Sequence, residues 1–226
     1  MVILLLAAMD KEISLLTNLL ENIQIEEKDF IQYWKGSIGD KTVYISKCGI
    51  GKVNSALNTA ALIRYFKPDM VINSGVAGGA GIPIGSILVA DKVAYHDVWC
   101  GPGTYYGQAD GFPLFMKPSS ILLELINSSD IKDEVKIGLI CSGDKFISEA
   151  EEISFIRSKF PDVMAVDMES ASISQTCIKY DIPFAIIRVI SDTPGEGENI
   201  SQYKDFWDKA PLKSFMIISK ILKFLK

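Results

Sequence analysis

Acidic residues stand directly after three of the apolar stretches that are typical of buried strands. They are Asp10 and Glu12 after VILLLAA, Asp167 and Glu169 after VMAV, and Asp192 after FAIIRVIS. Carboxylates held in separate environments can activate a water, hold sugar hydroxyls or protonate a leaving group. The pattern therefore favours an enzyme that cleaves a small molecule, with several of these acids sharing one site.

Helix capping is a simpler explanation for part of this pattern. Asp10 and Asp167 stand where helix N-caps are expected. Glu12 and Glu169 stand in first turns, where the helix dipole favours a negative charge, and either would be ordinary if it stood alone. We assign both aspartates to capping and keep both glutamates as site candidates. Asp192 follows an almost wholly apolar strand, so we expect it to be buried.

The elements that position these acids alternate along the chain. Strands fit residues 2–8, 30–36, 41–47, 70–73, 86–98, 135–141, 163–166 and 183–191, and helices fit 11–20, 52–66, 119–127, 149–159, 168–179 and 203–225. This order predicts an α/β fold with helices on both faces of a mixed sheet. Ligands of such sheets bind beyond the carboxyl ends of strands, where the acids stand. Arg188, inside the last strand, needs an acidic partner because a buried guanidinium is costly alone.

The bulk composition bounds the class of protein. The chain has 226 residues, 48% of them hydrophobic, and no composition break, so we expect one domain over residues 1–226. No apolar run is long enough to span a membrane, and the first residues lack the features of a signal peptide. We expect a cytoplasmic protein without a membrane partner. A net charge of -5 also argues against binding nucleic acid.

The cysteines and the single histidine give no metal or disulfide pattern. Cys48, Cys100, Cys141 and Cys177 are scattered without a CxxC pair, and His96 is the only histidine. Neither a zinc site nor a disulfide framework is indicated. We expect four buried free thiols and no metal.

Two glycine-rich motifs and one long loop need separate interpretation. GIGK at 49–52 lacks the first glycine and the Ser or Thr of a phosphate-binding loop, and GVAGGAG at 75–81 contains no GxGxxG. A plain dinucleotide-binding domain is therefore disfavoured. Residues 95–116, rich in glycine and aromatic residues, have neither helical nor strand periodicity. A loop of this length is usually functional or interfacial, and the alternative is a locally packed surface loop.

A family resemblance covers nearly the whole chain. It is carried by the ordered segments LAAMDKE, CGIGKVNSA, KPDMVINSGVAGG, YHD, YGQ, CSGDKFI, AVDMESASISQTC and PFAIIRVISD. Together these segments resemble the bacterial 5′-methylthioadenosine/S-adenosylhomocysteine nucleosidases of the purine nucleoside phosphorylase superfamily. The resemblance implies a three-layer α/β/α sandwich with a central mixed β-sheet. It also implies a homodimer that hydrolyses adenine nucleosides to adenine and a thioribose without a cofactor.

The resemblance gives the acids separate roles. Glu12 matches the general base that activates water, Asp192 the acid that protonates N7 of adenine, and Glu169 the residue that holds the ribose hydroxyls. The other substrate contacts that it implies are Met168 on the sugar, Phe146 stacked on adenine, the Ile147 backbone at the purine edge, Ile50 near the 5′ tail, Ala77 and Gly78 at a strand end, and Arg188 and Ser191, which order the water and the acid.

Three departures from the family pattern concern the water and the 5′ tail. Val76 stands where the family more often has a serine that helps to hold the water. The segment DVWCGPGTY is about one residue shorter than usual, and Trp99 is our candidate for the residue that caps the partner's 5′ pocket. The stretch TPGEGENISQYKDFW also departs from the common pattern, so Tyr203 and Phe206 are both candidates for closing over the 5′ substituent. The choice of 5′ group therefore stays open.

Alternative functions also stay open. A relative that acts on aminodeoxyfutalosine or inosine would share the catalytic acids, and a nucleoside sensor without catalysis would share the fold. A phosphorylase usually binds phosphate with arginines. Because Arg64 and Arg157 fall within predicted helices and leave only Arg188, we favour hydrolysis over phosphorolysis.

Overall fold

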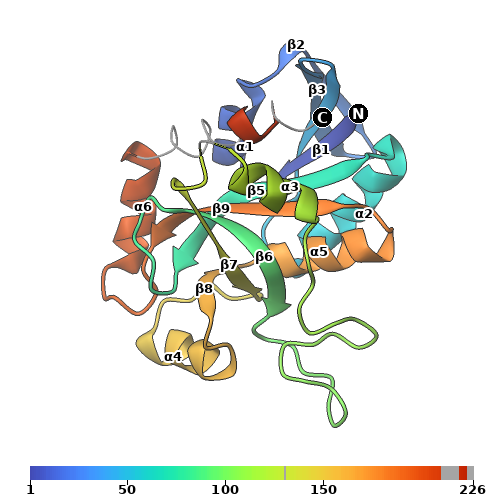
Figure 1. Cartoon of the computed structure of the whole chain (residues 1–226). Helices are drawn as coiled ribbons and strands as arrows, with labels where there is room; N and C mark the ends of the chain where they lie inside the picture. The colour runs from blue at the N-terminus through green and yellow to red at the C-terminus, as the bar shows by residue number, and fades with distance from the viewer. Residues whose placement is uncertain (130, 210–218, 223–226) are drawn as a thin grey trace.

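The computed structural model describes residues 1–129, 131–209 and 219–222. The strands are β1 (Val2–Ala7), β2 (Glu21–Lys28), β3 (Ile31–Ile38), β4 (Lys41–Lys47), β5 (Met70–Gly79), β6 (Ile87–Tyr95), β7 (Val135–Ser142), β8 (Val163–Asp167) and β9 (Phe184–Asp192). The helices with assigned bounds are α1 (Asp10–Thr17), α2 (Lys52–Phe66), α3 (Ser120–Asn127), α4 (Ala150–Lys159), α5 (Ser170–Lys179) and α6 (Asn199–Lys209). Figure 1 shows their arrangement.

The strands form one mixed nine-stranded sheet in the order β2-β3-β4-β1-β5-β8-β7-β6-β9. β1 is parallel to both β4 and β5, whereas β6 and β9 are antiparallel. β9 also pairs with β5 in parallel, so the five strands from β5 to β9 close on themselves. This arrangement brings the carboxyl ends of β1, β5, β8 and β9 to one region of the sheet.

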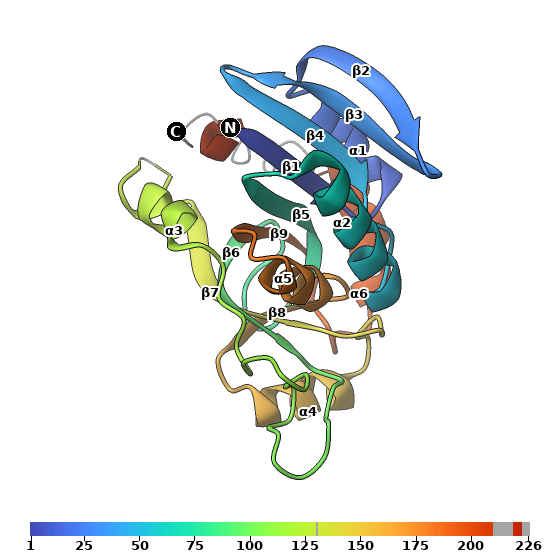
Figure 2. The ribbon, with the colours of Figure 1, turned by 90° about the vertical axis from the view of Figure 1, so that its right-hand side faces the viewer.

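Two apolar layers sandwich the sheet, because alternate residues of the buried strands point to opposite faces. In β1, Ile3 and Leu5 belong to a core cluster shared with residues of α1, α3 and α6. Leu4 and Leu6 belong to a second cluster shared with α2 and α5. Figure 2 shows α2 and α5 side by side on their face. The predicted three-layer α/β/α sandwich with a central mixed sheet is thus confirmed.

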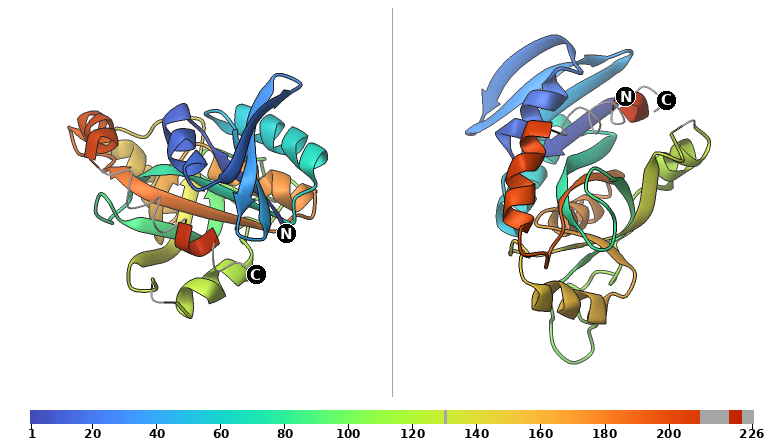
Figure 3. Two further views of the ribbon diagram at one scale, coloured as in Figure 1. Left: turned by 90° about the horizontal axis from the view of Figure 1, so that it is seen from above. Right: turned by 90° about the vertical axis from the view of Figure 1, so that its left-hand side faces the viewer.

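One strand was missed by the sequence prediction. β2 is exposed along its whole length and carries four charged residues among its eight, and only Ile23 and Ile25 alternate with polar residues, so the strand pattern is short. Pairing with β3 holds it in place. The hairpin of β2 and β3 projects from the rest of the molecule (Figures 2 and 3).

β5 is longer than predicted because it continues through a glycine-rich segment. It runs on to Gly79, whereas the apolar pattern ended at Asn73. A Cβ atom at Gly79 would lie 2.6 Å from the carbonyl oxygen of Ile82 and 2.7 Å from Cγ2 of Ile190. Only glycine allows this approach, which lets β5 pair with β8 at its end. The glycine-rich segment that does not match a dinucleotide-binding motif therefore lets the end of β5 pair with β8.

Other predictions had mixed outcomes. Residues 96–115 are irregular as expected, and Figure 2 shows this loop extending beyond α4. Three of the four cysteines are buried free thiols, but Cys100 is exposed because it lies in that loop, so this part of the prediction was wrong.

The helix expected at 203–225 begins earlier, at Asn199, and most of its second half lies outside the described residues. No helix in the described ranges has the length and apolar character needed to cross a bilayer.

Candidate active site

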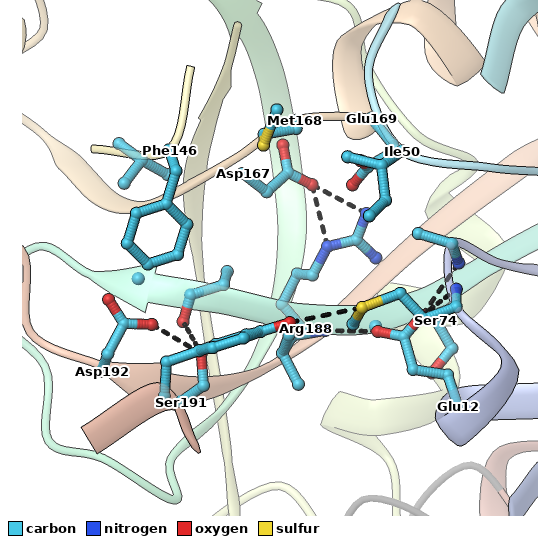
Figure 4. A pocket seen from close by; sticks show the side chains of 18 of the residues that line it. Glu12, Ile50, Ser74, Phe146, Asp167, Met168, Glu169, Arg188, Ser191 and Asp192 are labelled. Atoms are coloured by element: carbon cyan, nitrogen blue, oxygen red, sulfur yellow. Dashed lines mark hydrogen bonds and ion pairs between the residues drawn. The ribbon is translucent and has the colours of Figure 1, made fainter. Parts of the chain in front are cut away.

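A pocket opens where the carboxyl ends of β1, β5, β8 and β9 meet. Of the eleven predicted site residues, ten line it: Glu12, Ile50, Ala77, Gly78, Phe146, Met168, Glu169, Arg188, Ser191 and Asp192. Ile147 lines an adjoining hollow together with Phe146, Met168 and Asp192. In Figure 4, Asp192 and Phe146 lie on one side of the pocket and Glu12 on the other, with Met168 and Glu169 along a third side. Residues from six different elements or loops therefore converge.

Glu12 is buried, and three main-chain N–H groups hold its carboxylate. The amides of Ala8 and Met9 donate to Oε2 at 2.8 and 2.9 Å, and that of Val76 donates to Oε1 at 3.1 Å. Burial raises the pKa of Glu12, whereas the positive charge of Arg188 and the three donors lower it. Because the last two influences favour the carboxylate, Glu12 is suited to accept a proton.

The capping prediction for Asp10 was wrong. Helix α1 begins at Asp10, with Met9 in the cap position, and the Met9 amide donates to Glu12 rather than to an aspartate. Asp10 is exposed and pairs with Lys47 at 2.9 Å. Glu12 thus satisfies the start of the helix with one oxygen, while its other oxygen faces β5.

Gly75 leaves the space that the Glu12 carboxylate occupies. A Cβ atom at this position would lie 2.8 Å from Oε1 of Glu12. Any side chain at residue 75 would therefore displace the carboxylate, which explains why a strand interior carries glycine here.

Arg188 is fully buried and forms an ion pair with Asp167. Its Nε and Nη2 atoms lie 2.8 and 2.7 Å from Oδ2 of Asp167, and Nη1 donates to the carbonyl oxygens of Asn73 and Ile187. The Asn73 side-chain oxygen accepts from Nη2 as well. Asp167 is therefore the acidic partner that the sequence predicted for Arg188 without identifying it.

The capping prediction for Asp167 is only partly correct, because Glu169 and not Asp167 stands at the N-cap of α5. Oδ2 of Asp167 accepts the amide of Ser170, the first residue of α5, at 3.2 Å. Its oxygens also accept from the hydroxyls of Ser142 and Ser170. Asp167 therefore joins β7, α5 and β9 beneath the pocket, and with so many donors its charge is well compensated.

Glu169 is buried, and its side chain is not used to cap α5. Oε1 accepts the amide of Gly51 at 3.0 Å, from the loop between β4 and α2. Burial and the nearby Asp167 raise the pKa of Glu169 to about 7, although Arg188 and the Gly51 amide oppose this. The carboxyl oxygens of Glu169 lie at the wall of the pocket, where they can also accept hydrogen bonds from hydroxyl groups.

Asp192 is buried, as predicted, and is held by side chains. The Ser191 hydroxyl donates to Oδ1 at 2.7 Å, and the amide nitrogen of Asn199 lies 3.4 Å from Oδ2. Burial raises the pKa of Asp192, and the two donors lower it. Asn199 also donates to the carbonyl oxygen of Ile147 at 3.2 Å. Sequence reasoning missed Asn199, since a lone amide in a polar loop carries no signal of its own.

Phe146 and Tyr203 form an aromatic wall across the pocket. Their rings meet edge to face with centroids 5.7 Å apart, and the Tyr203 hydroxyl lies 3.3 Å from the Met9 sulfur. Of the two aromatic candidates for closing over the 5′ group, Tyr203 lines the pocket, whereas Phe206 packs in the core beneath α6. Trp99 is exposed and does not line this pocket in its own chain.

Among the residues that the structure describes, no group of three or more His, Cys, Asp or Glu side chains converges in a way that could hold a metal ion. The acids of the pocket are instead held by amides, hydroxyls and Arg188.

Comparison with known proteins places this fold and site in one class. The model of the phosphorylase superfamily matches residues 2–223. A 5′-methylthioadenosine/S-adenosylhomocysteine nucleosidase from Staphylococcus saprophyticus is 38% identical over 224 residues, covering 97% of this chain and 98% of the relative. The chain therefore belongs to the phosphorylase superfamily and, within it, to the 5′-methylthioadenosine/S-adenosylhomocysteine nucleosidases.

Solved structures of such nucleosidases agree closely with this chain. The Neisseria meningitidis enzyme in complex with methylthio-immucillin-A has a TM-score of 0.93 and 35% identity, covering 99% of each chain. The Colwellia psychrerythraea enzyme in complex with adenine has a TM-score of 0.91 and 32% identity, covering 98% of this chain and 94% of the other. Each of these complexes holds adenine or a nucleoside analogue.

Proposed function

We propose that this protein hydrolyses the N-glycosidic bond of 5′-methylthioadenosine and S-adenosylhomocysteine, releasing adenine and the corresponding thioribose. The observation that carries the proposal is the convergence of three buried acids, Glu12, Glu169 and Asp192, in one pocket. Relatives of the same fold bind adenine and a methylthio nucleoside analogue, which agrees with this substrate class.

The chemistry of the three acids fits this reaction. Cleavage of an N-riboside passes through a state with positive charge on the sugar, and it needs a proton on the leaving base and a water on the opposite face. In our assignment Asp192 protonates N7 of adenine, and Glu12, across the pocket, takes a proton from the water. Glu169, on a third side of the pocket, holds the ribose hydroxyls.

The remaining contacts follow from where each residue lies. Phe146 is placed to stack on the base and the Ile147 backbone to meet its edge, while Ile50, Met9 and Tyr203 surround the 5′ end. Met168, Ala77 and Gly78 complete the walls around the sugar. Because Met9 and Tyr203 are in contact, this end of the pocket favours a small apolar 5′ group.

Hydrolysis is favoured over phosphorolysis by the positions of the arginines. Arg64 and Arg157 are exposed on α2 and α4 and do not line the pocket. Arg188 does line it, but Asp167 and Asn73 already accept from its guanidinium. A phosphate ion would therefore find no uncommitted arginine among the described residues that line this pocket.

Val76 changes how the water is positioned. Its side chain cannot hydrogen-bond a water, but its main-chain amide donates to Glu12. In this protein the water is therefore ordered by Glu12, Arg188 or main-chain groups, without help from a hydroxyl at residue 76.

We further propose a homodimer that uses the face formed by α2 and α5. On α2, Val53 and Leu57 are 67% and 65% exposed, and they border an apolar groove shared with α5. Trp99 and Tyr105 in the adjacent loop are also exposed. A contiguous apolar surface of this kind is typical of interfaces. Light scattering should give twice the chain mass, and Leu57→Glu should reduce this measured mass.

A cytoplasmic location agrees with four free cysteines.

The activity is tested by incubating the protein with methylthioadenosine, with and without phosphate, and measuring free adenine. Adenine should form at the same rate in both buffers, and Glu12→Gln should form almost none. Adenine that appears only with phosphate would overturn hydrolysis. The rates for adenosylhomocysteine, inosine and aminodeoxyfutalosine under the same conditions establish which 5′ groups and bases are accepted.

A further inference from the structure

Three charged side chains outside the pocket form a cluster that joins three loops. Lys52 begins α2, Asp97 follows β6, and Asp144 follows β7. The Lys52 ammonium lies 2.7 Å from Oδ2 of Asp97 and 3.8 Å from Oδ2 of Asp144. The Asp144 amide donates to the same Asp97 oxygen at 2.8 Å. Asp97 is thus the shared centre of the cluster.

Two glycines allow these loops to approach so closely. A Cβ atom at Gly51, whose φ is +87°, would lie 3.0 Å from Oδ1 of Asp144. A Cβ atom at Gly143 would lie 2.7 Å from Cγ of Asp97. A larger residue at either position would push the loops apart, so the sequence keeps the three chain segments in contact.

The cluster is connected to the pocket through two consecutive amides. The Lys52 amide donates to Oδ1 of Asp144 at 2.7 Å, and the preceding Gly51 amide donates to Oε1 of Glu169 at 3.0 Å. One peptide segment therefore lies between a carboxylate of the cluster and a carboxylate of the pocket. If the first contact moves, the second must move with it.

We propose that the cluster of Lys52, Asp97 and Asp144 positions the Gly51 amide on Glu169 and thereby sets the affinity for the ribose of the substrate. This inference rests on the proposed function, since it assumes that Glu169 holds the ribose. None of the three residues lines the pocket, so they are positioning residues.

The competing explanation is a surface ion cluster that contributes only to folding. The Lys52 and Asp97 side chains are 23% and 29% exposed, and ion pairs at such positions contribute little on average. Lys92 provides a matched control in the same protein. It is 29% exposed, pairs with Asp162 at 3.5 Å and lies over the ring of Phe115, much as Lys52 lies over the ring of Tyr95. It has no contact with the pocket loops among those described.

The test compares Lys52→Met, Asp97→Asn, the double variant and the control Lys92→Met. For the first two, we expect the KM for methylthioadenosine to rise about tenfold with kcat within about twofold, because a hydrogen bond to a charged group is weakened in ground and transition states alike. The double variant should resemble each single one, since both break the same cluster. Lys52→Arg should restore most of the affinity, and Lys92→Met should behave like the wild type.

Free adenine supplies a second readout, because it lacks the ribose. Its inhibition constant should change less than about twofold in Lys52→Met. Thermal unfolding and light scattering on every variant detect losses of fold or of subunit association. If Asp97→Asn does not fold, the comparison of Lys52→Met with Lys52→Arg and Lys92→Met still distinguishes a positioning role from a role in folding alone.

Several results would overturn the inference. They are an unchanged KM in Lys52→Met, an equal rise in Lys92→Met, or an equal weakening of adenine binding. Failure of the wild type to release adenine is a different result, which overturns the proposed function itself and is seen before any variant is made.

Discussion

The two ends of the pocket use the same kind of group in different settings. At one end Glu12 accepts three main-chain amides and lies near the charge of Arg188. At the other end Asp192 accepts from the side chains of Ser191 and Asn199. Burial raises the pKa of both acids, but the opposing influences differ in kind. These different settings are what the proposed base, Glu12, and the proposed acid, Asp192, would need in one pocket.

The difference also separates what is fixed by the backbone from what depends on side chains. The donors to Glu12 belong to the β1–α1 turn and to β5, so they stay in place whatever side chains surround them. The donors to Asp192 come from the end of β9 and the start of α6, and a single substitution removes either one. The acid end is therefore the more easily tuned of the two.

Removing either acid should give the largest effect. Glu12→Gln and Asp192→Asn each remove a proton-transfer group, so kcat should fall about 10² to 10⁴-fold. Adenine release under saturating substrate measures this fall. Both variants should remain folded by circular dichroism, because each amide keeps the size of the acid it replaces. A variant that is folded and retains more than about a tenth of the wild-type kcat would remove that residue from its role.

Arg188→Met tests what this cation contributes to buried Asp167 and to Glu12 at the base end. It leaves Asp167 buried without its partner, so the free energy of unfolding should fall by about 3–5 kcal/mol in urea titrations. Because Arg188 lowers the pKa of Glu12, its loss should raise that pKa and move the acidic limb of kcat/KM to higher pH. A loss below about 1 kcal/mol, or an unmoved acidic limb, would show that the ion pair does not have this role.

Glu169, on the third side of the pocket, should make stability depend on pH. Its pKa in the folded protein is about 7, against 4.5 for an ordinary glutamate. A raised carboxyl pKa favours folding while the group is protonated, and this contribution is lost as the pH rises from about 4.5 to 7. The loss is on the order of 3 kcal/mol. Urea titrations of wild type and Glu169→Gln across this range should show a steeper decline in the wild type, and equal slopes would contradict the shift.

Ser191→Ala should give the smallest effect and act only at the acid end. It removes a donor that lowers the pKa of Asp192, so that pKa should rise and the alkaline limb of kcat/KM should move to higher pH. The acidic limb, which reports Glu12, should stay in place. The rate at neutral pH should fall only a few-fold, since one neutral hydrogen bond is worth about 1 kcal/mol. Movement of both limbs would mean that the two ends are not independent.

The sequence predicted which residues line the pocket better than it predicted the contacts among them. Strand-end acids could be found because parallel strands bring their carboxyl ends together. The sequence could not show that Glu12 rather than Asp10 accepts the amide at the start of α1, because either acid can satisfy the start of a helix. Asn199 and Met9 reach the pocket only through the fold, and a lone amide or thioether has no recognisable pattern.

Parts of the fold were hidden for similar physical reasons. β2 has no buried face, and its apolar residues are limited to Ile23 and Ile25, so its strand pattern is short. The pairing of β5 with β8 depends on Gly78 and Gly79. In a sequence, two consecutive glycines indicate a turn rather than a strand. Long apolar strands such as β1 and β9 were predicted to within a few residues, since both of their faces are buried.

The most direct test of the division between the two ends uses a leaving group that needs no proton. A 4-nitrophenyl 5-methylthioriboside releases nitrophenolate, which departs as an anion, so protonation by Asp192 becomes unnecessary while the water still needs Glu12. We expect Asp192→Asn to cleave this substrate within about tenfold of the wild-type rate and Glu12→Gln to remain slower by about 10² or more. Equal losses in both variants, or a rescue of Glu12→Gln instead, would contradict the assignment of base and acid.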